Sequence, residues 1–193
     1  MASASTSTQR QPFTAPASER TRDNPAVAAP LVLTVAPATA SVRVRRAENS
    51  DLNDLVILED RTFDSDRMTR DQYRRHLDSD TALVLVASAN HRRFLGTAVV
   101  FFRKGSKVAR LYSLASQPES RGKGVGTALI EATEKAARRR RCKALRLEVR
   151  TDSAAAISLY ERLGYRRLGL LKAYYQDGAD GWRYEKVLAQ PAP

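Results

Sequence analysis

Between residues 42 and 189 the sequence repeatedly changes its apolar period, from the two-residue period of strands to the 3.6-residue period of helices. This order constrains the fold more than any other feature of the chain. Val42 and Val44 alternate with Arg43 and Arg45, which predicts a half-buried first strand. The other predicted strands are residues 82–87, 94–102, 108–116, 144–149, 165–171 and 183–188. With the helices between them, they give the order β α α β β β α β α β β, which predicts one α/β domain with a mixed sheet and helices on both faces.

The predicted helices have apolar residues at helical spacing and are bounded by residues that begin or end helices. A side-chain oxygen before a helix can accept from its free N–H groups, and a capping box adds a second, reciprocal bond. Glycine can adopt the left-handed conformation that ends a helix. The predicted N-caps are Ser50, Asp152 and the Thr69–Gln72 capping box, and the predicted stop is Gly164.

The chain divides into a domain and two flanking segments. Residues 1–41 hold five of the eight prolines and no glycine, among many Ala, Ser and Thr residues, which predicts a disordered tail. Reading Ala26–Ala40 as the apolar part of a signal peptide is disfavoured, because acidic residues precede the run and prolines interrupt it. The predicted domain is residues 42–189, and residues 190–193 form a short C-terminal tail.

Composition limits the classes of partner. Lys and Arg outnumber Asp and Glu 33 to 21, so the formal charge of +12 favours nucleic acids, phosphate-bearing ligands or acidic partners. No stretch is long and apolar enough to span a bilayer, so no membrane association is expected. Cys142 has no second cysteine to pair with, which favours a reducing, cytoplasmic setting. With two histidines it cannot build a typical structural metal site, and none is expected.

The run Arg121–Thr127, which reads Arg-Gly-Lys-Gly-Val-Gly-Thr, lies between a predicted strand and a predicted helix. Glycines there let backbone N–H groups turn toward a pyrophosphate, and the helix adds the positive end of its dipole. A Walker A loop would need glycine in place of Gln117 and Ser or Thr after Lys123. The dinucleotide fingerprint would need glycine in place of Thr127 or Leu129. The run therefore predicts a phosphate cradle of neither kind.

Arg121-x-x-Gly124-x-Gly126 resembles the acyl-CoA pyrophosphate loop of the GNAT acetyltransferase superfamily. The resemblance continues through Leu147–Arg150, Asp152–Tyr160 and Leu163–Tyr165, which are similar to the branch of ribosomal-protein alanine N-acetyltransferases (RimI-like). It implies a mostly antiparallel, twisted sheet of about seven strands. It also implies acetyl-CoA as acetyl donor and direct transfer to an amine in a ternary complex.

By the resemblance, Glu148 is the general base, through water, and Tyr160 is the general acid that protonates the leaving thiolate. If the helix after Ser153 runs back along the preceding strand, Tyr160 returns to the level of Glu148. Two alternatives stay open: Glu148 shares a strand face with Arg146 and Arg150 and can simply pair with them, and Tyr160 can be a core aromatic. The residues expected to bind acetyl-CoA are Leu114, Ala115, Ser116, Arg121, Gly122, Lys123, Gly124, Val125, Gly126, Thr127, Asp152 and Ala155.

The sequence constrains the acetyl acceptor less than it constrains the acetyl donor. Tyr174, Tyr175 and Asp177 combine aromatic rings and a carboxylate on a basic domain, so they are candidates to bind a cationic amine, although a polar hairpin tip explains them equally well. The ribosomal branch often has Pro-Trp where this chain has residues 65–69, and asparagine where it has Asp152. The leading acceptor is a protein N-terminal α-amine, with ribosomal proteins among the candidates. The alternatives are a small-molecule amine (polyamine, amino acid or drug) and a basic, non-catalytic nucleic-acid-binding module.

Overall fold

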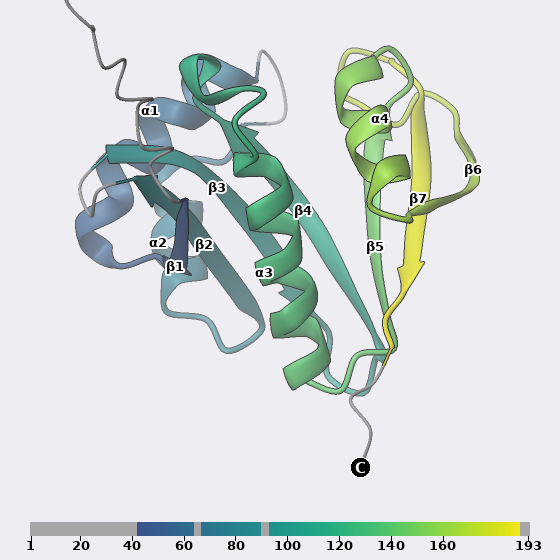
Figure 1. Cartoon of the computed structure of the whole chain (residues 1–193), viewed down its shortest axis with the longest axis horizontal. Coiled ribbons are helices and arrows are strands. Elements are labelled where there is room, and N and C mark those ends of the chain that lie inside the picture. Colours follow the sequence, from purple (N-terminus) through teal and green to yellow (C-terminus); the bar gives the residue numbers. More distant parts are fainter. Residues whose placement is uncertain (1–41, 64–66, 90–92, 190–193) are drawn as a thin grey trace, which may run out of the picture. The chain divides into compact units, whose positions relative to one another are not determined.

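The computed structural model describes residues 42–63, 67–89 and 93–189 (Figure 1). The predicted tails, residues 1–41 and 190–193, lie outside the described residues. So do Ser65 and Asp66 of the segment that replaces Pro-Trp, and most of the predicted hairpin loop between the second and third strands.

The described residues form a seven-stranded sheet in the order β1-β2-β3-β4-β5-β7-β6. Within it β4 and β5 are the one parallel pair, and the other neighbours are antiparallel. The prediction of a mixed, mostly antiparallel sheet is confirmed. The strands are β1 Arg43–Arg46, β2 Ala82–Ala89, β3 Arg93–Phe102, β4 Val108–Ser116, β5 Ala144–Arg150, β6 Arg166–Leu171 and β7 Gly181–Val187.

Helices cover both faces of this sheet, as predicted (Figure 1). On one face, Leu129 and Ile130 of α3 join the core that contains Ala98 of β3. On the other face, Leu55 of α1 and Tyr73 of α2 join a second core over the same strands. The helices are α1 Leu52–Thr62, α2 Arg70–Leu77, α3 Val125–Arg139 and α4 Ala154–Arg162, with 3-10 turns at Asn49–Asp51 and Pro118–Ser120.

Two predicted helix boundaries are confirmed. At the start of α2 the Thr69 N–H donates to Gln72 Oε1 at 2.7 Å, and the Gln72 N–H donates to Thr69 Oγ1 at 3.3 Å, which is the expected capping box. Gly164 has φ +84° just after α4, the left-handed conformation that ends a helix.

The other two predicted N-caps are wrong. Ser50 lies inside a 3-10 turn, because the chain begins its helical path earlier, at Glu48, whose N–H donates to Asp51 Oδ2 at 2.8 Å. Asp152 does not cap α4, whose N-cap is Ser153. The Asp152 carboxylate instead accepts from Arg150, because a doubly hydrogen-bonded guanidinium competes better for it than a backbone N–H does.

The sheet opens between β4 and β5. The two strands pair only from Val108 and Ala144 to Leu111 and Leu147, and then diverge (Figure 1). In the pairing with β3, Ser113 and Leu111 face consecutive residues, so Tyr112 is an extra residue in a β-bulge. A bulge bends its strand. It therefore turns β4 away from β5 at the point where their pairing ends.

Candidate active site

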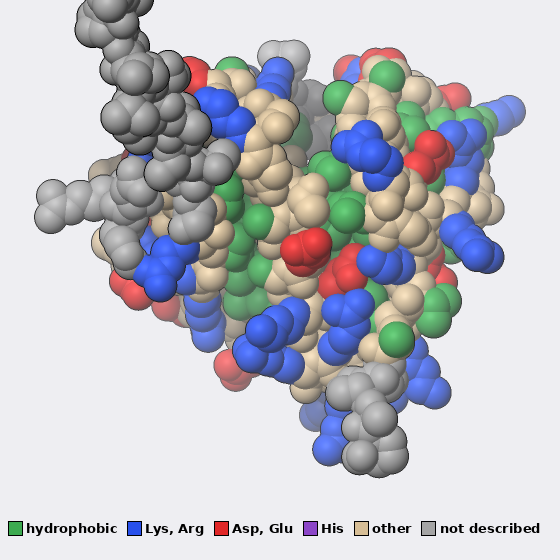
Figure 2. Space-filling view, in the orientation of Figure 1, with side chains coloured by type: hydrophobic (Ala, Val, Ile, Leu, Met, Phe, Trp, Pro, Cys, Tyr) green, Lys and Arg blue, Asp and Glu red, His purple; other side chains and the backbone are tan. Residues whose placement is uncertain are grey.

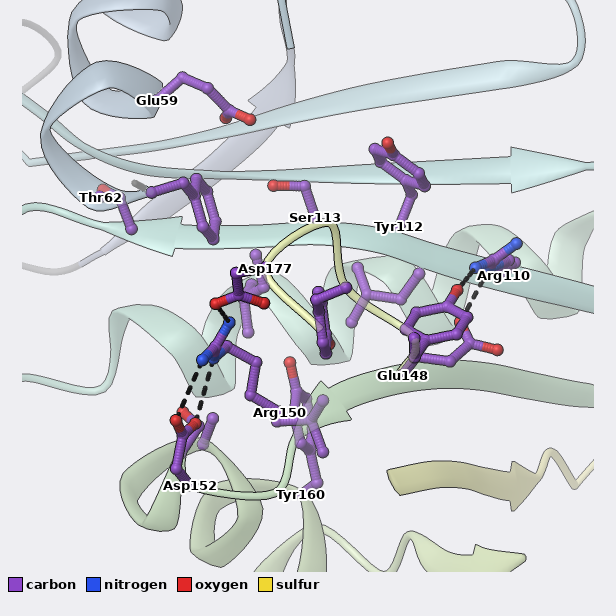
Figure 3. A pocket seen from close by; sticks show the side chains of 18 of the residues that line it. Glu59, Thr62, Arg110, Tyr112, Ser113, Glu148, Arg150, Asp152, Tyr160 and Asp177 are labelled. Atoms are coloured by element: carbon purple, nitrogen blue, oxygen red, sulfur yellow. Dashed lines mark hydrogen bonds and ion pairs between the residues drawn. The ribbon is translucent and has the colours of Figure 1, made fainter. Parts of the chain in front are cut away.

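A cavity of about 820 Å³ lies where β4 and β5 diverge (Figure 3). Its walls come from α1, β4, β5, α4 and the loop between β6 and β7. The predicted site residues that line it are Leu114, Arg121, Glu148, Asp152, Tyr160, Tyr174, Tyr175 and Asp177. The predicted residues outside its lining are Ala115, Ser116, Gly122, Lys123, Gly124, Val125, Gly126, Thr127 and Ala155.

Glu148 is held by two arginines from neighbouring strands. Its side chain is 6% exposed, and its carboxylate accepts from Arg110 Nε at 2.9 Å and from Arg183 Nε at 3.0 Å. The expected alternative partners, Arg146 and Arg150, pair elsewhere, Arg146 with Glu185. Glu148 is thus an ion-pair partner, but to different arginines from those that the strand pattern suggested, and it still lines the cavity.

Tyr160 lies on α4 and lines the same cavity as Glu148, so the structure brings the two predicted catalytic side chains together. The residue is 6% exposed, and its ring packs edge-on against Tyr165 with the centroids 5.8 Å apart. Burial raises the pKa of the Tyr160 phenol, so the hydroxyl stays protonated at neutral pH. Tyr160 is thus a packed aromatic residue that also lines the cavity.

Arg150, at the end of β5, pairs with two carboxylates of the cavity wall, Asp152 and Asp177 (Figure 3). It donates to both Asp152 oxygens at 3.1 Å and to Asp177 Oδ2 at 2.7 Å, and it lies 5.3 Å from the centre of the Tyr175 ring. The hydrogen bond from Arg150 holds the pKa of Asp177 below its usual value. Because Asp177 is already paired, its charge is largely neutralised before any amine arrives. Tyr174 packs edge-on against Tyr175 and accepts a hydrogen bond from Arg110.

Glu59 is a further carboxylate on the cavity wall, besides Glu148, Asp152 and Asp177, and the sequence did not lead us to expect it there. It is 2% exposed, and it accepts from Tyr73 Oη at 2.7 Å and from the Met68 N–H at 3.0 Å. Burial raises the pKa of the Glu59 carboxyl above its usual value. The signal was present in the sequence, since Glu59 stands at helical spacing within the apolar stripe of α1, where an acid is unusual.

Two hydroxyls of the cavity wall have no hydrogen-bond partner among the described residues: Ser113 Oγ on β4 and Thr62 Oγ1 at the end of α1. Ser113 is 9% exposed. Buried hydroxyls are nearly always hydrogen-bonded, so polar groups of a ligand or water are expected to reach them.

The glycine cluster forms an open turn before α3. Gly122 and Gly124 have φ +74° and +78°, and a Cβ added to either would meet no atom within 4 Å. The first N–H groups of α3, at Val125–Thr127, belong to the helix end that lacks intrahelical acceptors. Gly126 has another role, since a Cβ there would lie 2.9 Å from Leu159 Cδ2 of α4. The open face, free N–H groups and Arg121 fit a pyrophosphate.

Within the described ranges no group of His, Cys, Asp and Glu side chains is arranged to hold a metal ion. The helices described there are also too short or too polar to cross a bilayer.

The described residues therefore form an open α/β sheet that splits beside a glycine-rich turn, and the cavity in the split is lined by Tyr160 and by carboxylates that include Glu59 and Glu148. The model of the acetyltransferase (GNAT) family matches residues 50–165, more than half of the chain. The chain belongs to this family.

Curated relatives match part of the chain. An N-alpha-acetyltransferase of Saccharolobus solfataricus is 40% identical over 90 residues, which is 46% of this chain and 49% of the relative. N-alpha-acetyltransferase 30 of Schizosaccharomyces pombe is 41% identical over 71 residues, 37% of this chain and 47% of the relative. The chain thus spans about half the length of these curated relatives.

Among solved structures, the ribosomal-protein-S18-alanine N-acetyltransferase from Escherichia coli superposes with a TM-score of 0.69 at 24% identity. The superposition covers 79% of this chain and 97% of the other. At this identity the likeness shows a shared fold.

Proposed function

We propose that this protein is an acetyl-CoA-dependent N-acetyltransferase that acts on the α-amine of a protein or peptide N-terminus by direct transfer in a ternary complex. One observation carries the proposal: a single cavity is lined by Tyr160, Glu148 and Glu59 and borders the open glycine turn. The names of the partial relatives, N-alpha-acetyltransferases, support the choice of acceptor. The E. coli neighbour makes a ribosomal protein a reasonable acceptor to test. The lone cysteine agrees with a cytoplasmic setting.

Acetyl-CoA supplies an activated acetyl thioester and a thiolate leaving group. The residues proposed to hold its pyrophosphate are the N–H groups of Val125–Thr127, together with Arg121. The backbone of Leu114–Ser116 is proposed to hold the pantetheine arm, because β4 has no strand partner on its β5 side beyond Leu111. The remaining predicted contacts, Lys123, Asp152 and Ala155, stay part of the proposal.

Tyr160 is proposed to protonate the leaving thiolate. The leaving group is a thiolate whose thiol form has a pKa near that of cysteine, about 8.5, and it can accept a proton from a donor that is still protonated at neutral pH. Burial keeps the Tyr160 phenol in that protonated form. The same raised pKa reduces the driving force for donation, so the phenol must lie within hydrogen-bond distance of the sulfur.

Two carboxylates are available to take the proton of the acceptor amine. The assignment to Glu148 rests on the family resemblance, although the Glu148 carboxylate already accepts hydrogen bonds from Arg110 and Arg183. The case for Glu59 rests on its burial and raised pKa, which bring it nearer to the working pH. An α-amine has a pKa of about 8, so roughly a tenth of it is already neutral at pH 7 and little help is needed.

Tyr174 and Tyr175 are proposed to contact the acceptor's first residues, since both line the cavity. Asp177 is a weaker candidate for binding an amine than expected, because Arg150 occupies it. Attraction for a cationic amine is better supplied by Glu59, which is buried and hydrogen-bonded by neutral donors.

The test is thiol release from acetyl-CoA with a panel of N-terminal peptides, polyamines, amino acids and aminoglycosides. A peptide preference of at least about tenfold in kcat/KM supports the proposal, and a polyamine or drug preference replaces it with the small-molecule alternative. Nucleic-acid binding without any acetyl-CoA binding would establish the non-catalytic alternative.

Glu59→Gln and Glu148→Gln identify the base. The variant that lacks the base should lose about 10²-fold in kcat/KM near pH 7. That loss should shrink as the pH rises above about 8, where the amine is already neutral. The other variant should show a smaller loss that does not depend on pH. If neither variant loses activity, both assignments are wrong.

A further inference from the structure

A concentration of exposed cations lies at the end of the domain away from the cavity. It comes from two loops, the turn between β3 and β4 and the connection from α3 to β5, and we call it the cationic end. The loops are side by side, because the N–H groups of Lys143 and Ala144 donate to the Lys107 carbonyl at 2.6 and 3.3 Å. Its side chains are Arg103, Lys104, Lys107, Arg139, Arg141 and Lys143, all exposed. In Figure 2, Lys and Arg side chains gather around the C-terminal end of α3.

No carboxylate of the described residues forms an ion pair with any of these six cations. The neighbouring arginines differ in this respect. Arg138 pairs with Glu134 at 3.0 Å, and Arg140 donates to the Asp80 carbonyl at 2.6 Å while lying 4.1 Å from the centre of the Phe102 ring. Arg138 and Arg140 therefore stabilise the fold, whereas the cationic end is available to an anionic partner.

The partial negative charge at the C-terminal end of α3 does not account for the number of cations at the cationic end. The carbonyl end of a helix carries about half an elementary charge, and Arg138 and Arg140 already lie beside it. The further cations on both loops repel one another. Such an accumulation persists at a cost to folding unless a partner compensates it.

Arg141 adds a second cost to folding, which is strain in its own backbone. It has φ +58° directly after α3, where the Cys142 N–H donates to the Ala137 carbonyl at 3.0 Å and the Arg141 N–H to the Arg138 carbonyl at 2.8 Å. This is the helix-ending arrangement in which glycine is the usual residue, because a Cβ strains the left-handed conformation. An arginine at this position adds charge where glycine would fold better.

We propose that the cationic end binds the phosphate backbone of a double-stranded nucleic acid without reading its sequence. Clustered Lys and Arg side chains on one face are the electrostatic footprint of such binding. An anionic membrane fits less well, because binding at a membrane surface also buries apolar side chains. Val187, which pairs with Ala144 in the sheet, is the exposed large apolar residue placed at this end by the strand register.

Bound nucleic acid would leave the cavity open. α3 begins at the glycine turn and ends at Arg139, so its 15 residues separate that turn from the cationic end by about 21 Å. β4 and β5 likewise start at the cationic end and run toward the cavity. The surface therefore acts as an attachment site that holds the domain near its acceptor while transfer proceeds.

The full chain is titrated onto labelled 20-base-pair RNA and DNA duplexes of one sequence, and onto phosphatidylserine vesicles, between 50 and 200 mM KCl. We expect binding to one or both duplexes, with log Kd linear in log salt. Binding to the vesicles alone, or no duplex binding at 50 mM KCl, overturns the proposal.

Matched triple variants locate the contact. Lys107→Gln, Arg139→Gln and Lys143→Gln should together weaken duplex binding at least tenfold and reduce the salt slope by two to three. Arg61→Gln, Arg75→Gln and Arg166→Gln, which remove the same charge from exposed positions elsewhere, should weaken it less than threefold. Equal weakening by the two triples would assign the affinity to net charge alone and refute a local site.

A third variant separates binding from folding. Arg141→Gly removes one cation and relieves the left-handed strain, so its Tm should stay equal or rise while duplex binding weakens about threefold. Thiol release from acetyl-CoA should be unchanged in this variant, so the result does not depend on the acceptor proposed above. Unchanged duplex affinity with a raised Tm would show that Arg141 has no part in binding.

Discussion

Replacing Gly96 with alanine is expected to destabilise the fold and weaken acetyl-CoA binding together. Gly96 lies on β3 opposite Ser116, and a Cβ there would stand 2.6 Å from the Ala115 carbonyl oxygen, 3.1 Å from Val125 Cγ1 and 3.2 Å from Ser116 Cα. Two of these atoms are backbone, so a side-chain rotation cannot relieve the contact. The end of β4 and the start of α3 must therefore move away from residue 96 to make room for the new methyl group.

The size of the effect follows from two opposing contributions. Overpacking a core costs about 1–3 kcal/mol. Replacing glycine with alanine also restricts the unfolded chain, which returns about 0.4–1 kcal/mol. The net loss of about 1–2 kcal/mol corresponds to a fall in Tm of about 2–8 °C for a domain of this size. Because Ser116 and Val125 are proposed to contact the donor, the Kd for acetyl-CoA should rise about tenfold.

Gly169→Ala is the matched control. Gly169 also lies in a strand, and a Cβ there would meet no atom within 4 Å. The Tm of the Gly169→Ala variant should therefore equal or slightly exceed that of the unsubstituted protein. Thermal unfolding and calorimetric titration with acetyl-CoA of both variants complete the test. If Gly96→Ala matches Gly169→Ala in Tm and in acetyl-CoA affinity, the packing argument at the β3–β4 pair is refuted.

Three further changes test other parts of the structure. Tyr160→Phe should lower kcat about 10²-fold while the calorimetric Kd for acetyl-CoA changes less than twofold, and an unchanged kcat would remove Tyr160 from the chemistry. Gly124→Glu should abolish acetyl-CoA binding in the same titration, because φ is +78° and the new carboxylate repels the pyrophosphate; retained affinity would place the donor elsewhere. Asp51→Asn should lower the free energy of unfolding by about 2 kcal/mol at pH 7 by weakening the pair with Arg45, whose Nη2 lies 2.7 Å from Asp51 Oδ1. Burial alone would raise the pKa of Asp51, but the hydrogen bonds from Arg45 and the Glu48 N–H together with the Arg45 charge leave that pKa lowered, so this stabilisation is present above the unfolded-state value and is lost on acidification. Denaturant titrations of both proteins should therefore converge as the pH falls through the lowered pKa of Asp51, and a gap that stays constant on acidification would contradict the assignment.

The element order and two helix boundaries could be predicted because their determinants are local. The Thr69–Gln72 capping box needs only residues within one turn, and Gly164 needs only its own missing Cβ. Ser50 and Asp152 carry equally local signals, yet both predictions were wrong. In each case a group two residues earlier, Glu48 at the first helix and Arg150 at the fourth, competed with the expected cap and changed where the helix begins.

The site was less predictable because its chemistry depends on the register of strands. Glu148 was found from its motif, but its partners Arg110 and Arg183 stand 38 and 35 residues away, and pairing across β4, β5 and β7 brings them to it. Periodicity places Glu59 on the inner face of α1 without showing that Tyr73 and the Met68 N–H satisfy it. Likewise the left-handed Arg141 has no sequence signal, since arginine is not expected there.

The short pairing of β4 with β5 links binding to folding. The pairing of these strands runs from Val108 to Leu111 and no further, so the outer half of β5, which stays paired with β7, is joined to β1–β4 mainly through side chains. A donor and an acceptor bound in the split would bridge the two parts, and the protein should resist unfolding more as their concentrations rise above Kd. The backbone amides of residues 148–150 would then exchange with solvent more slowly in the ternary complex than in the free protein.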